Sequence, residues 1–307
     1  MKSVIVTGAN GFVGRYLLRY LSDLGYFTYA IVRNEAEDIS SIEEIPNVEI
    51  VYCDLECISE LPQLIEQRDI IAAYHLAWAG SSGILRENYL LQLKNIEWTC
   101  DFITAIGKMK INRVIISGSV VQLMFRDYLT EDQITPDMKT CYAIGKIASE
   151  YFCKCLSVKF GINVCWAYIT NFYGIDDPTN NFINFLIEHY LEKKVPILSS
   201  AEQLADFTYV TDIAKGLFYA CEKGKPNTSY YIGYGKPRPL KYFINIVKDS
   251  IDPKIESGIG ISTFNGRDVD FEKVDVNKLY RDTGYKAEVS FEDGIKRLID
   301  YRCNRKK

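Results

Sequence analysis

The chain has 307 residues, 48% of them hydrophobic and 25% charged, and its formal net charge is −4. This length suggests two lobes or one large domain, and the composition is that of a globular protein with a sizeable core, which excludes extensive disorder and a disulfide-rich miniprotein. Basic residues cluster only at Arg305-Lys306-Lys307, which argues against nucleic acid as the main partner.

Membrane and metal chemistry are also disfavoured. The longest apolar stretches, such as residues 70–79, are shorter than the roughly 20 residues that cross a bilayer. Nine cysteines are spread along the chain without a C-x-x-C pair, as expected of thiols in a reducing compartment. Neither His75 nor His189 has a companion at metal-ligand or triad spacing. We expect a cytoplasmic protein with no membrane partner and no metal.

Short β-branched runs alternate with helical patterns through the first half of the chain. The expected strands are residues 4–6, 27–32, 48–52, 70–76, 113–117 and 164–169, and the expected helices are residues 15–24, 88–108 and 142–159. This alternation is typical of a parallel sheet with helices on both faces. It predicts an α/β fold with a doubly wound parallel sheet.

The regular alternation ends after Asn171, where we expect a smaller C-terminal lobe to begin. Further helices are expected at residues 181–192, 237–250 and 291–302, and a strand and helix at 207–210 and 212–221. We expect residues 1–170, joined by the strand and helix near 206–221, to form the first lobe. Residues 171–205 and 222–307 would form the second.

The first strand ends in a glycine-rich turn that opens a helix. Its sequence is Thr7-Gly8-Ala9-Asn10-Gly11-Phe12-Val13-Gly14. The glycines allow a tight turn and a close approach of the backbone to a pyrophosphate, and the helix N-terminus supplies N–H groups. The turn therefore predicts a dinucleotide site.

Arg33 bears on which dinucleotide binds. It stands at the end of the second strand, where an acidic residue would bond the ribose hydroxyls of NAD, and a guanidinium suits a 2′-phosphate. NADP(H) is favoured, and NAD(H) is the alternative if Arg33 is only a surface residue. Asp54, after the third strand, is either a partner for the adenine amino group or a helix cap.

Tyr142 and Lys146 form the strongest chemical element. Their i, i+4 spacing places phenol and ammonium on one helix face, where the charge of Lys146 would lower the pKa of Tyr142 and make it a proton donor. They follow the run Ser117-Gly118-Ser119, at the predicted end of a parallel strand. Open α/β sheets bind their ligands beyond such strand ends.

In this order the motifs resemble those of extended short-chain dehydrogenase/reductases of the nucleotide-sugar epimerase/dehydratase group. The residues that carry the resemblance are the glycine-rich turn, Asp54-Leu55, His75-Leu76-Ala77, Asn95 with Thr99, Ser117-Gly118-Ser119, Tyr142 to Lys146, residues 171–174 and residues 206–212. The resemblance implies a Rossmann lobe for the cofactor and a smaller lobe for a nucleoside-diphosphate sugar. It also implies a homodimer through the helices at 88–108 and 142–159, unless their apolar positions are ordinary core.

The resemblance implies roles for individual residues. Ser119, Tyr142 and Lys146 are the expected catalytic residues, with Ser117 as the alternative to Ser119. Besides the glycine-rich turn, the expected cofactor-binding residues are Arg33, Asp54, Leu55, Leu76, Ala77, Asn95, Ser117, Tyr142, Lys146 and Ile169. The expected substrate-binding residues are Trp78, Ser81, Ser119, Asn171 and Arg267. Arg267 and, alternatively, Arg238 are candidates for the diphosphate because the family's nucleotide-binding arginine is missing, unless they are simply exposed.

Four positions depart from the family's pattern. Val120 follows Ser119 where 4,6-dehydratases carry an acidic pair, which disfavours dehydration. Tyr168 and Gln122 stand where arginine and tyrosine are usual in relatives. Ala205 stands where an arginine often contacts the nucleotide, so the base is left open.

These residues lead to one favoured hypothesis and two alternatives. The favoured one is an NADP(H)-dependent enzyme that reduces, or reversibly oxidises, the C4 carbonyl of a nucleoside-diphosphate 4-keto-6-deoxyhexose for a surface polysaccharide. The first alternative is a nucleoside-diphosphate-sugar 4-epimerase that keeps NAD tightly bound. The second is a non-catalytic NADP-binding regulator, which the presence of both Tyr142 and Lys146 disfavours.

Overall fold

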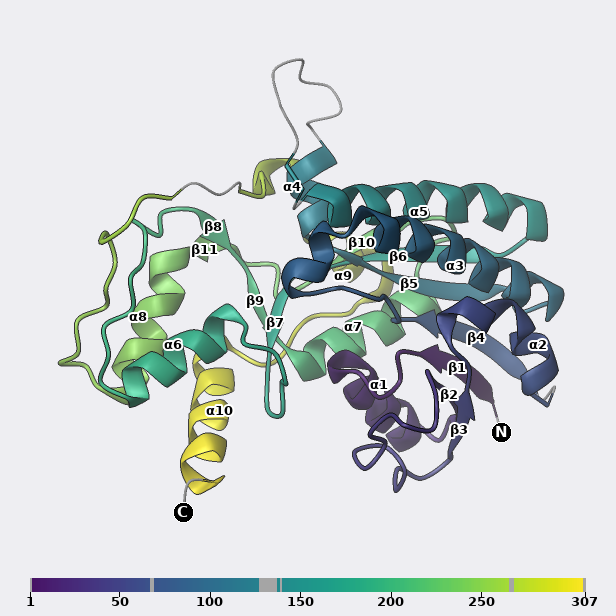
Figure 1. Ribbon diagram of the computed structural model, residues 1–307, viewed down its shortest axis with the longest axis horizontal. Helices are drawn as coiled ribbons and strands as arrows, with labels where there is room; N and C mark the ends of the chain where they lie inside the picture. The colour runs from purple at the N-terminus through teal and green to yellow at the C-terminus, as the bar shows by residue number, and fades with distance from the viewer. Residues whose placement is uncertain (1, 67–68, 127–136, 139, 265–267, 306–307) are drawn as a thin grey trace.

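A parallel sheet forms the centre of the molecule (Figure 1). The structure, a computed structural model, describes residues 2–66, 69–126, 137–138, 140–264 and 268–305. Within these ranges the sheet has seven strands in the order β10-β6-β5-β4-β1-β2-β3, all parallel. The strands are β1 Ser3–Thr7, β2 Phe27–Val32, β3 Val48–Tyr52, β4 Ile70–His75, β5 Arg113–Ser119, β6 Asn163–Ile169 and β10 Ser229–Ile232. The predicted doubly wound α/β fold is confirmed.

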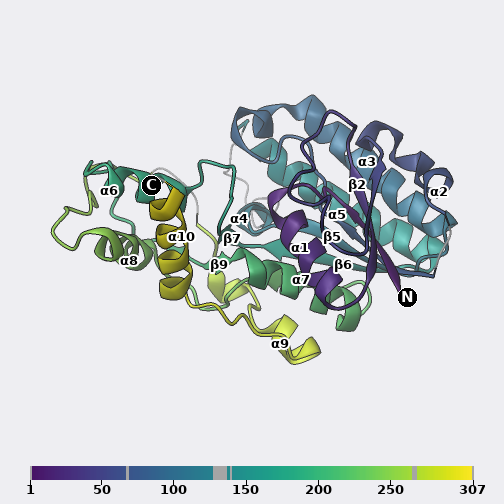
Figure 2. The ribbon, with the colours of Figure 1, turned by 90° about the horizontal axis from the view of Figure 1, so that it is seen from below.

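Helices cover both faces of this sheet (Figure 1 and Figure 2). α1 Phe12–Asp23 and α7 Val210–Lys223 pack on one face, and α3 Tyr89–Lys108 and α5 Thr140–Phe160 on the other. Successive strand side chains point to opposite faces. Val4 and Val6 therefore join the α1 and α7 core, while Ile5 joins the α3 and α5 core.

Short elements complete this part of the chain. They are the 3-10 helices η1 Leu55–Glu60, η2 Gly83–Glu87 and η4 Phe271–Lys273 and the helices α2 Leu61–Leu64, α4 Val121–Arg126 and α9 Lys278–Thr283. Asn88 caps α3 by accepting a hydrogen bond from Leu91 N at 3.1 Å. Among the described residues, no helix is both long and apolar enough to span a bilayer.

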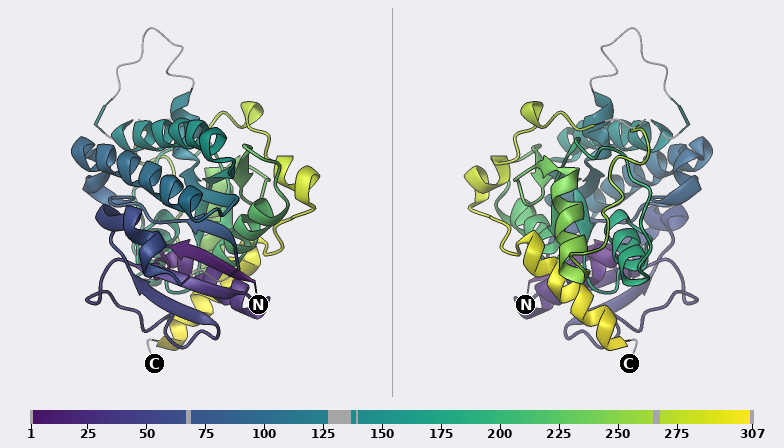
Figure 3. Two further views of the ribbon diagram at one scale, coloured as in Figure 1. Left: turned by 90° about the vertical axis from the view of Figure 1, so that its right-hand side faces the viewer. Right: turned by 90° about the vertical axis from the view of Figure 1, so that its left-hand side faces the viewer.

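A separate hydrophobic core lies beyond the carboxyl end of β6, at the left of Figure 1. It is formed by α6 Phe182–Leu191, α8 Leu240–Ile251 and α10 Phe291–Arg305, with residues from two strand pairs. The pairs are β7 Asn171–Tyr173 with β9 Phe207–Tyr209, and β8 Leu204–Ala205 with β11 Arg238–Pro239. Figure 3 shows α8 and α10 in front of the sheet in its right-hand view.

The strand that returns to the sheet differs from the one expected. Residues 207–209 pair with β7 outside the central sheet, and β10 at 229–232 pairs with β6 instead. Helix α7 still packs on the sheet and provides the crossover between β6 and β10. The pattern misled because Ser229-Tyr230-Tyr231-Ile232 contains a single β-branched residue, whereas Phe207-Thr208-Tyr209-Val210 contains two.

Candidate active site

The glycine-rich turn between β1 and α1 is packed too closely for side chains. Gly8 has a φ of +66°, and a Cβ there would lie 2.8 Å from Ala77 N. A Cβ at Gly14 would lie 2.2 Å from the carbonyl oxygen of Gly8. Gly11, the N-cap of α1, offers no side-chain cap, so the first N–H groups of the helix are left for another acceptor. These features fit the pyrophosphate of a dinucleotide.

Three expected cofactor residues have protein partners near the edge of this turn. Arg33 is 64% exposed, and its Nε lies 3.3 Å from the carboxylate of Glu37. The amide of Asn10 donates to the same carboxylate at 3.4 Å. Asp54 caps η1 by accepting from Glu56 N at 3.1 Å. This edge therefore carries both a guanidinium and a carboxylate.

The expected catalytic side chains meet at the carboxyl end of β5. Tyr142, from the first turn of α5, is 5% exposed, and the Ser119 hydroxyl lies close enough to its phenol to act on its pKa. Lys146 Nζ donates to the carbonyl oxygen of Ser117 at 2.6 Å. Ser119 thus supplies a hydroxyl to the tyrosine, whereas Ser117 supplies a backbone oxygen to the lysine.

The electrostatics of this group differ from the sequence expectation. Burial raises the pKa of Tyr142, while the guanidinium of Arg86 and the hydrogen bond from Ser119 act to lower it. Burial holds the pKa of Lys146 well below its usual range. Arg86, which was not expected from the sequence, is therefore a cation that acts on the phenol.

Trp78 covers Lys146 and links it to the cofactor turn. Lys146 Nζ lies 3.7 Å from the centroid of the Trp78 ring, which meets the Tyr142 ring edge to face at 6.1 Å. The neighbouring Ala77 donates its N–H to Thr7 Oγ1 at 3.3 Å, beside the end of β1. Residues 77 and 78 therefore join the glycine-rich turn to Tyr142 and Lys146.

Residues of α3 hold the segment that carries Trp78. Gln92 Oε1 accepts from the Trp78 indole N–H at 2.9 Å. The buried side chain of Asn95 accepts from Ala79 N at 2.9 Å and donates to Ala79 O at 2.8 Å. Asn95 thus fixes the backbone of this loop.

A buried polar cluster lies behind Ser119. Gln122 Oε1 accepts from Ser119 N at 2.9 Å, and Gln122 Nε2 donates to Glu150 at 3.2 Å. Tyr168 OH, Ser229 Oγ and Lys154 Nζ each donate to Glu150 at 2.7 Å. Gln122 and Tyr168, two positions that depart from the family's pattern, therefore share one carboxylate.

The remaining predicted residues are more dispersed. Leu76 N donates to Thr7 O at 3.2 Å beside the cofactor turn, and Leu55 begins η1. Buried Ile169 ends β6, and exposed Asn171 begins β7. Ser81 is exposed, and Arg267 lies outside the described residues.

His75 is a packed strand residue. Its Nδ1 lies 2.9 Å from Thr7 Oγ1, and its ring stacks on Phe102 at 4.3 Å. Burial and the nearby Lys146 charge lower its pKa to about 3. It is therefore neutral at physiological pH.

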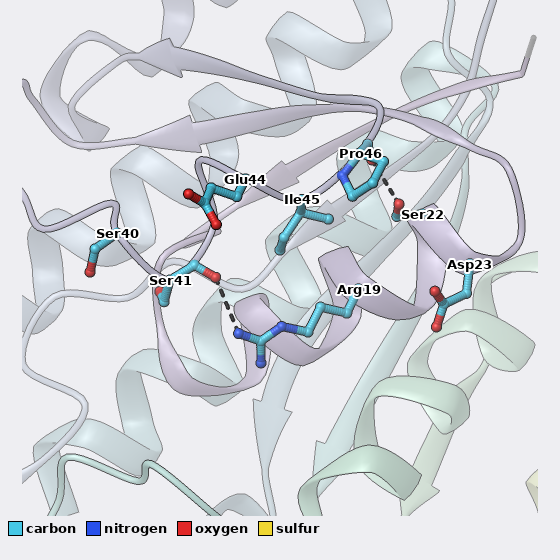
Figure 4. Close-up of a pocket in the computed structure, with 8 residues that line it drawn as sticks. All are labelled: Arg19, Ser22, Asp23, Ser40, Ser41, Glu44, Ile45 and Pro46. Carbon is cyan, nitrogen blue, oxygen red and sulfur yellow. Dashed lines mark hydrogen bonds between the residues drawn. The ribbon is translucent and has the colours of Figure 1, made fainter.

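A surface hollow elsewhere takes no part in this site (Figure 4). It has a volume of about 350 Å³ and lies between α1 and residues 40–46. Its lining residues are Arg19, Ser22, Asp23, Ser40, Ser41, Glu44, Ile45 and Pro46. None of these belongs to the predicted site.

Three contributors were not found from the sequence: Arg86, Gln92 and Glu150. Glu150 stands eight residues after Tyr142, so helical spacing could have placed it on the same face. Arg86 comes from η2, and no local pattern indicates that this turn folds over α5. Its position depends on tertiary packing.

The chain is similar to known nucleotide-sugar enzymes in sequence and in fold. The sequence model of the NAD dependent epimerase/dehydratase family matches residues 4–233. The dTDP-glucose 4,6-dehydratase of Salmonella typhimurium is 22% identical over 97% of this chain and 92% of its own length. Among solved structures, the UDP-glucose 4-epimerase of Thermotoga maritima with UDP-glucose is 19% identical, with a TM-score of 0.82 over 99% of this chain and 100% of that one. The UDP-glucuronic acid 4-epimerase of Bacillus cereus in complex with NAD is 22% identical, with a TM-score of 0.77 over 100% of each chain.

Proposed function

Because the chain belongs to the NAD dependent epimerase/dehydratase family, we propose that it oxidises or reduces C4 of a nucleoside-diphosphate sugar. It is an enzyme of this NAD-dependent, nucleotide-sugar kind. The proposed reaction is the reduction of the C4 carbonyl of a nucleoside-diphosphate 4-keto-6-deoxyhexose, or its reverse. One observation carries the proposal: the hydroxyls of Ser119 and Tyr142 meet at the end of a parallel strand, joined to the glycine-rich turn through residues 77 and 78.

The cofactor would be held mainly by backbone. The side-chain-free surface of Gly8, Gly11 and Gly14 and the uncapped start of α1 suit its pyrophosphate. A nicotinamide bound here supplies or accepts the hydride. Asn95 acts indirectly in this proposal, because it fixes the backbone of Ala79.

The protein's own residues would handle the proton. Tyr142 donates its phenolic proton to the sugar oxygen, and Ser119 hydrogen-bonds to the same oxygen. Tyr142 is buried and Ser119 is half-buried, which limits the access of water to the phenol during the transfer. Lys146 donates to Ser117 O and packs against the Trp78 ring, and in this proposal it orients the site. Trp78, Ser81, Asn171 and Arg267 are proposed to contact the sugar nucleotide.

Two observations favour reduction. Val120, directly after Ser119, packs in a small apolar cluster with Tyr231 and Val269, so this position offers no acid for water elimination. Arg33 lies at the end of β2, where its guanidinium suits the 2′-phosphate of NADP(H). We therefore propose NADP(H) as the cofactor.

A 4-epimerase with retained NAD is the second candidate, and Glu37 favours it. The carboxylate of Glu37 lies 3.3 Å from Arg33 and 3.4 Å from Asn10, so it partly neutralises the guanidinium. A carboxylate at this edge suits ribose hydroxyls and disfavours a 2′-phosphate.

The cofactor and its consumption distinguish the two candidates. Nucleotide that co-purifies would be released and identified, and the emptied protein titrated with NADPH and NADH by fluorescence. Exchangeable NADPH with at least about a tenfold preference, consumed one for one with a 4-keto-6-deoxy sugar nucleotide, supports the reductase. Tightly retained NAD with no net consumption supports the epimerase and overturns the reductase.

The Tyr142→Phe variant tests the chemistry itself. Removing the phenolic proton should lower kcat at least about a hundredfold, while the affinity for the cofactor stays close to wild type. Turnover would be measured with the substrate found above, and cofactor binding serves as the control for folding. A variant that kept most of its turnover would contradict the assignment.

We further propose a cytoplasmic homodimer. All nine cysteines, each in the described part of the chain, are free thiols, in keeping with a reducing compartment. Large apolar side chains are exposed on two neighbouring helices. They are Leu90 and Leu93 on α3, and Ile144, Tyr151, Phe152 and Val158 on α5. A second copy of this helix pair would cover them.

A further inference from the structure

The ring of Tyr142 is enclosed by groups from several elements. Among the described residues, Arg86 faces it from η2 and Ser119 from the end of β5, and Lys146 stands one turn further along α5. Trp78 meets the ring edge to face. Of these groups, Arg86 and Lys146 can carry a positive charge.

Arg86 is held over the face of the ring. Its guanidinium carbon lies 4.6 Å from the Tyr142 ring centroid, and its Nε donates to Ser81 O at 2.6 Å. The loop before it is fixed by the bonds from Asn95 to Ala79. A guanidinium stays charged at every pH at which the protein is folded. Its attraction to an aromatic face grows when the ring carries negative charge.

Lys146 is engaged elsewhere. Its ammonium donates to Ser117 O at 2.6 Å and lies 3.7 Å from the Trp78 ring centroid. The side chain is fully buried, which penalises its charged form. Arg86 is thus the permanent cation beside the phenol.

We propose that Arg86 is a positioning residue that acts through Tyr142, holding the ring and stabilising its phenolate. When the tyrosine donates, its O–H bond breaks, a new O–H bond forms on the substrate oxygen, and the electron pair left on the phenolate lies beneath the guanidinium. The direction of this transfer rests on the proposed function. The coupling between Arg86 and Tyr142 does not, because it can be measured without turnover.

The first experiment titrates Tyr142 alone. Near-ultraviolet phenolate absorbance would be recorded against pH. Subtracting the Tyr142→Phe curve from the wild-type curve gives the titration of Tyr142 with Arg86 present. Subtracting the Arg86→Met/Tyr142→Phe curve from the Arg86→Met curve gives it without Arg86. We expect loss of the guanidinium to raise the midpoint by about one pH unit or more. Arg86→Lys should raise it less. An unchanged midpoint would overturn the proposal.

A matched control removes a similar contact elsewhere. Arg19 lies over the Tyr16 ring at 5.7 Å on α1, outside the site, so Arg19→Met should leave the Tyr142 titration unchanged. Arg86→Gln provides a second neutral variant if Arg86→Met does not fold. Circular dichroism and thermal melting would check the fold of each variant.

The second experiment measures kcat against pH in the oxidising direction, where the phenolate is the base. In Arg86→Met the acid limb of the kcat profile should move to higher pH by the same amount as the titration midpoint. For a shift of one pH unit, kcat at a pH below the limb should fall roughly tenfold. Arg86→Lys should restore part of it. An equal loss at every pH indicates a structural defect and overturns the proposal. If the wild type shows no turnover, the proposed function is wrong. The titration then tests the role of Arg86 by itself.

Discussion

At the scale of single residues, burial decides how His75 behaves. The imidazole lies between Thr7 and Phe102, and burial together with the Lys146 charge lowers its pKa to about 3. In the unfolded chain its pKa would be about 6.5. Between these values the unfolded state binds one more proton than the folded state, so the free energy of unfolding falls as the pH decreases.

This difference gives a prediction for His75→Gln. The variant should be less stable than wild type at pH 7, because it loses the ring stacking on Phe102. From about pH 6 to pH 4, however, the wild-type free energy of unfolding should fall more steeply than that of the variant, by about 1.4 kcal/mol per pH unit. Urea denaturation at several pH values measures both slopes.

His189→Gln is the control, because His189 is only partly buried on α6. Its slope should resemble that of the wild type. Equal slopes for the wild type and His75→Gln would show that His75 is protonated in the folded protein.

The placement of the proposed catalytic residues could be predicted because it follows from local rules. Tyr142 and Lys146 share a helix face through their spacing, and Ser119 ends a parallel strand. Arg86 could not be predicted, since its position over Tyr142 depends on how η2 packs against α5. The partner of Arg33 was missed for the same reason, because Glu37 lies in an irregular segment after β2.

At the scale of secondary-structure elements, the Glu150 cluster ties α5 to α4, β6 and β10. Its carboxylate accepts bonds from Gln122, Lys154, Tyr168 and Ser229. Because it is almost fully buried, the free energy of its charge depends on these partners.

Glu150→Gln should therefore destabilise the protein by about 3 kcal/mol, because it leaves Lys154 without its anionic partner. The carboxylate only accepts hydrogen bonds, whereas the amide that replaces it also donates, so its bonding to Gln122 changes. Because Gln122 accepts from Ser119 N, kcat should fall as well. Chemical denaturation and initial rates measure the two effects.

A double-mutant cycle with Lys154→Met isolates the pair. We expect the double variant to lose less stability than the sum of the single variants, by at least about 1 kcal/mol. Strict additivity would mean that Glu150 and Lys154 contribute independently.

The elements themselves were predicted unevenly. The helix expected at 142–159 is observed at 140–160, because its apolar positions recur at helical spacing over a long stretch. The last strand of the sheet was not predicted, since a four-residue segment with two tyrosines carries little periodicity. Chain order alone could not decide whether β9 or β10 pairs with β6.

At the scale of the whole molecule, the exposed apolar residues of α3 and α5 predict self-association. Placing charges there with Leu93→Asp and Phe152→Asp should convert a dimer into a monomer, because a buried carboxylate without a partner is strongly unfavourable. Sedimentation velocity over a range of protein concentrations measures the change.

Ile197→Asp is the matched control, since Ile197 is exposed near the second core and away from these helices. It should leave the oligomeric state unchanged. A wild type that is monomeric at micromolar concentration would contradict the proposed dimer.

The late position of β10 has a consequence for synthesis on the ribosome. β1 to β6 emerge first, but the sheet is completed only when residues 229–232 have been made, after the strands and helix that lead through the second core. Until then one edge of β6 is unpaired, and the Glu150 carboxylate lacks Ser229. The nascent chain must pass through a stage with an open, aggregation-prone sheet edge, so its yield in cells should depend on chaperones that shield this edge.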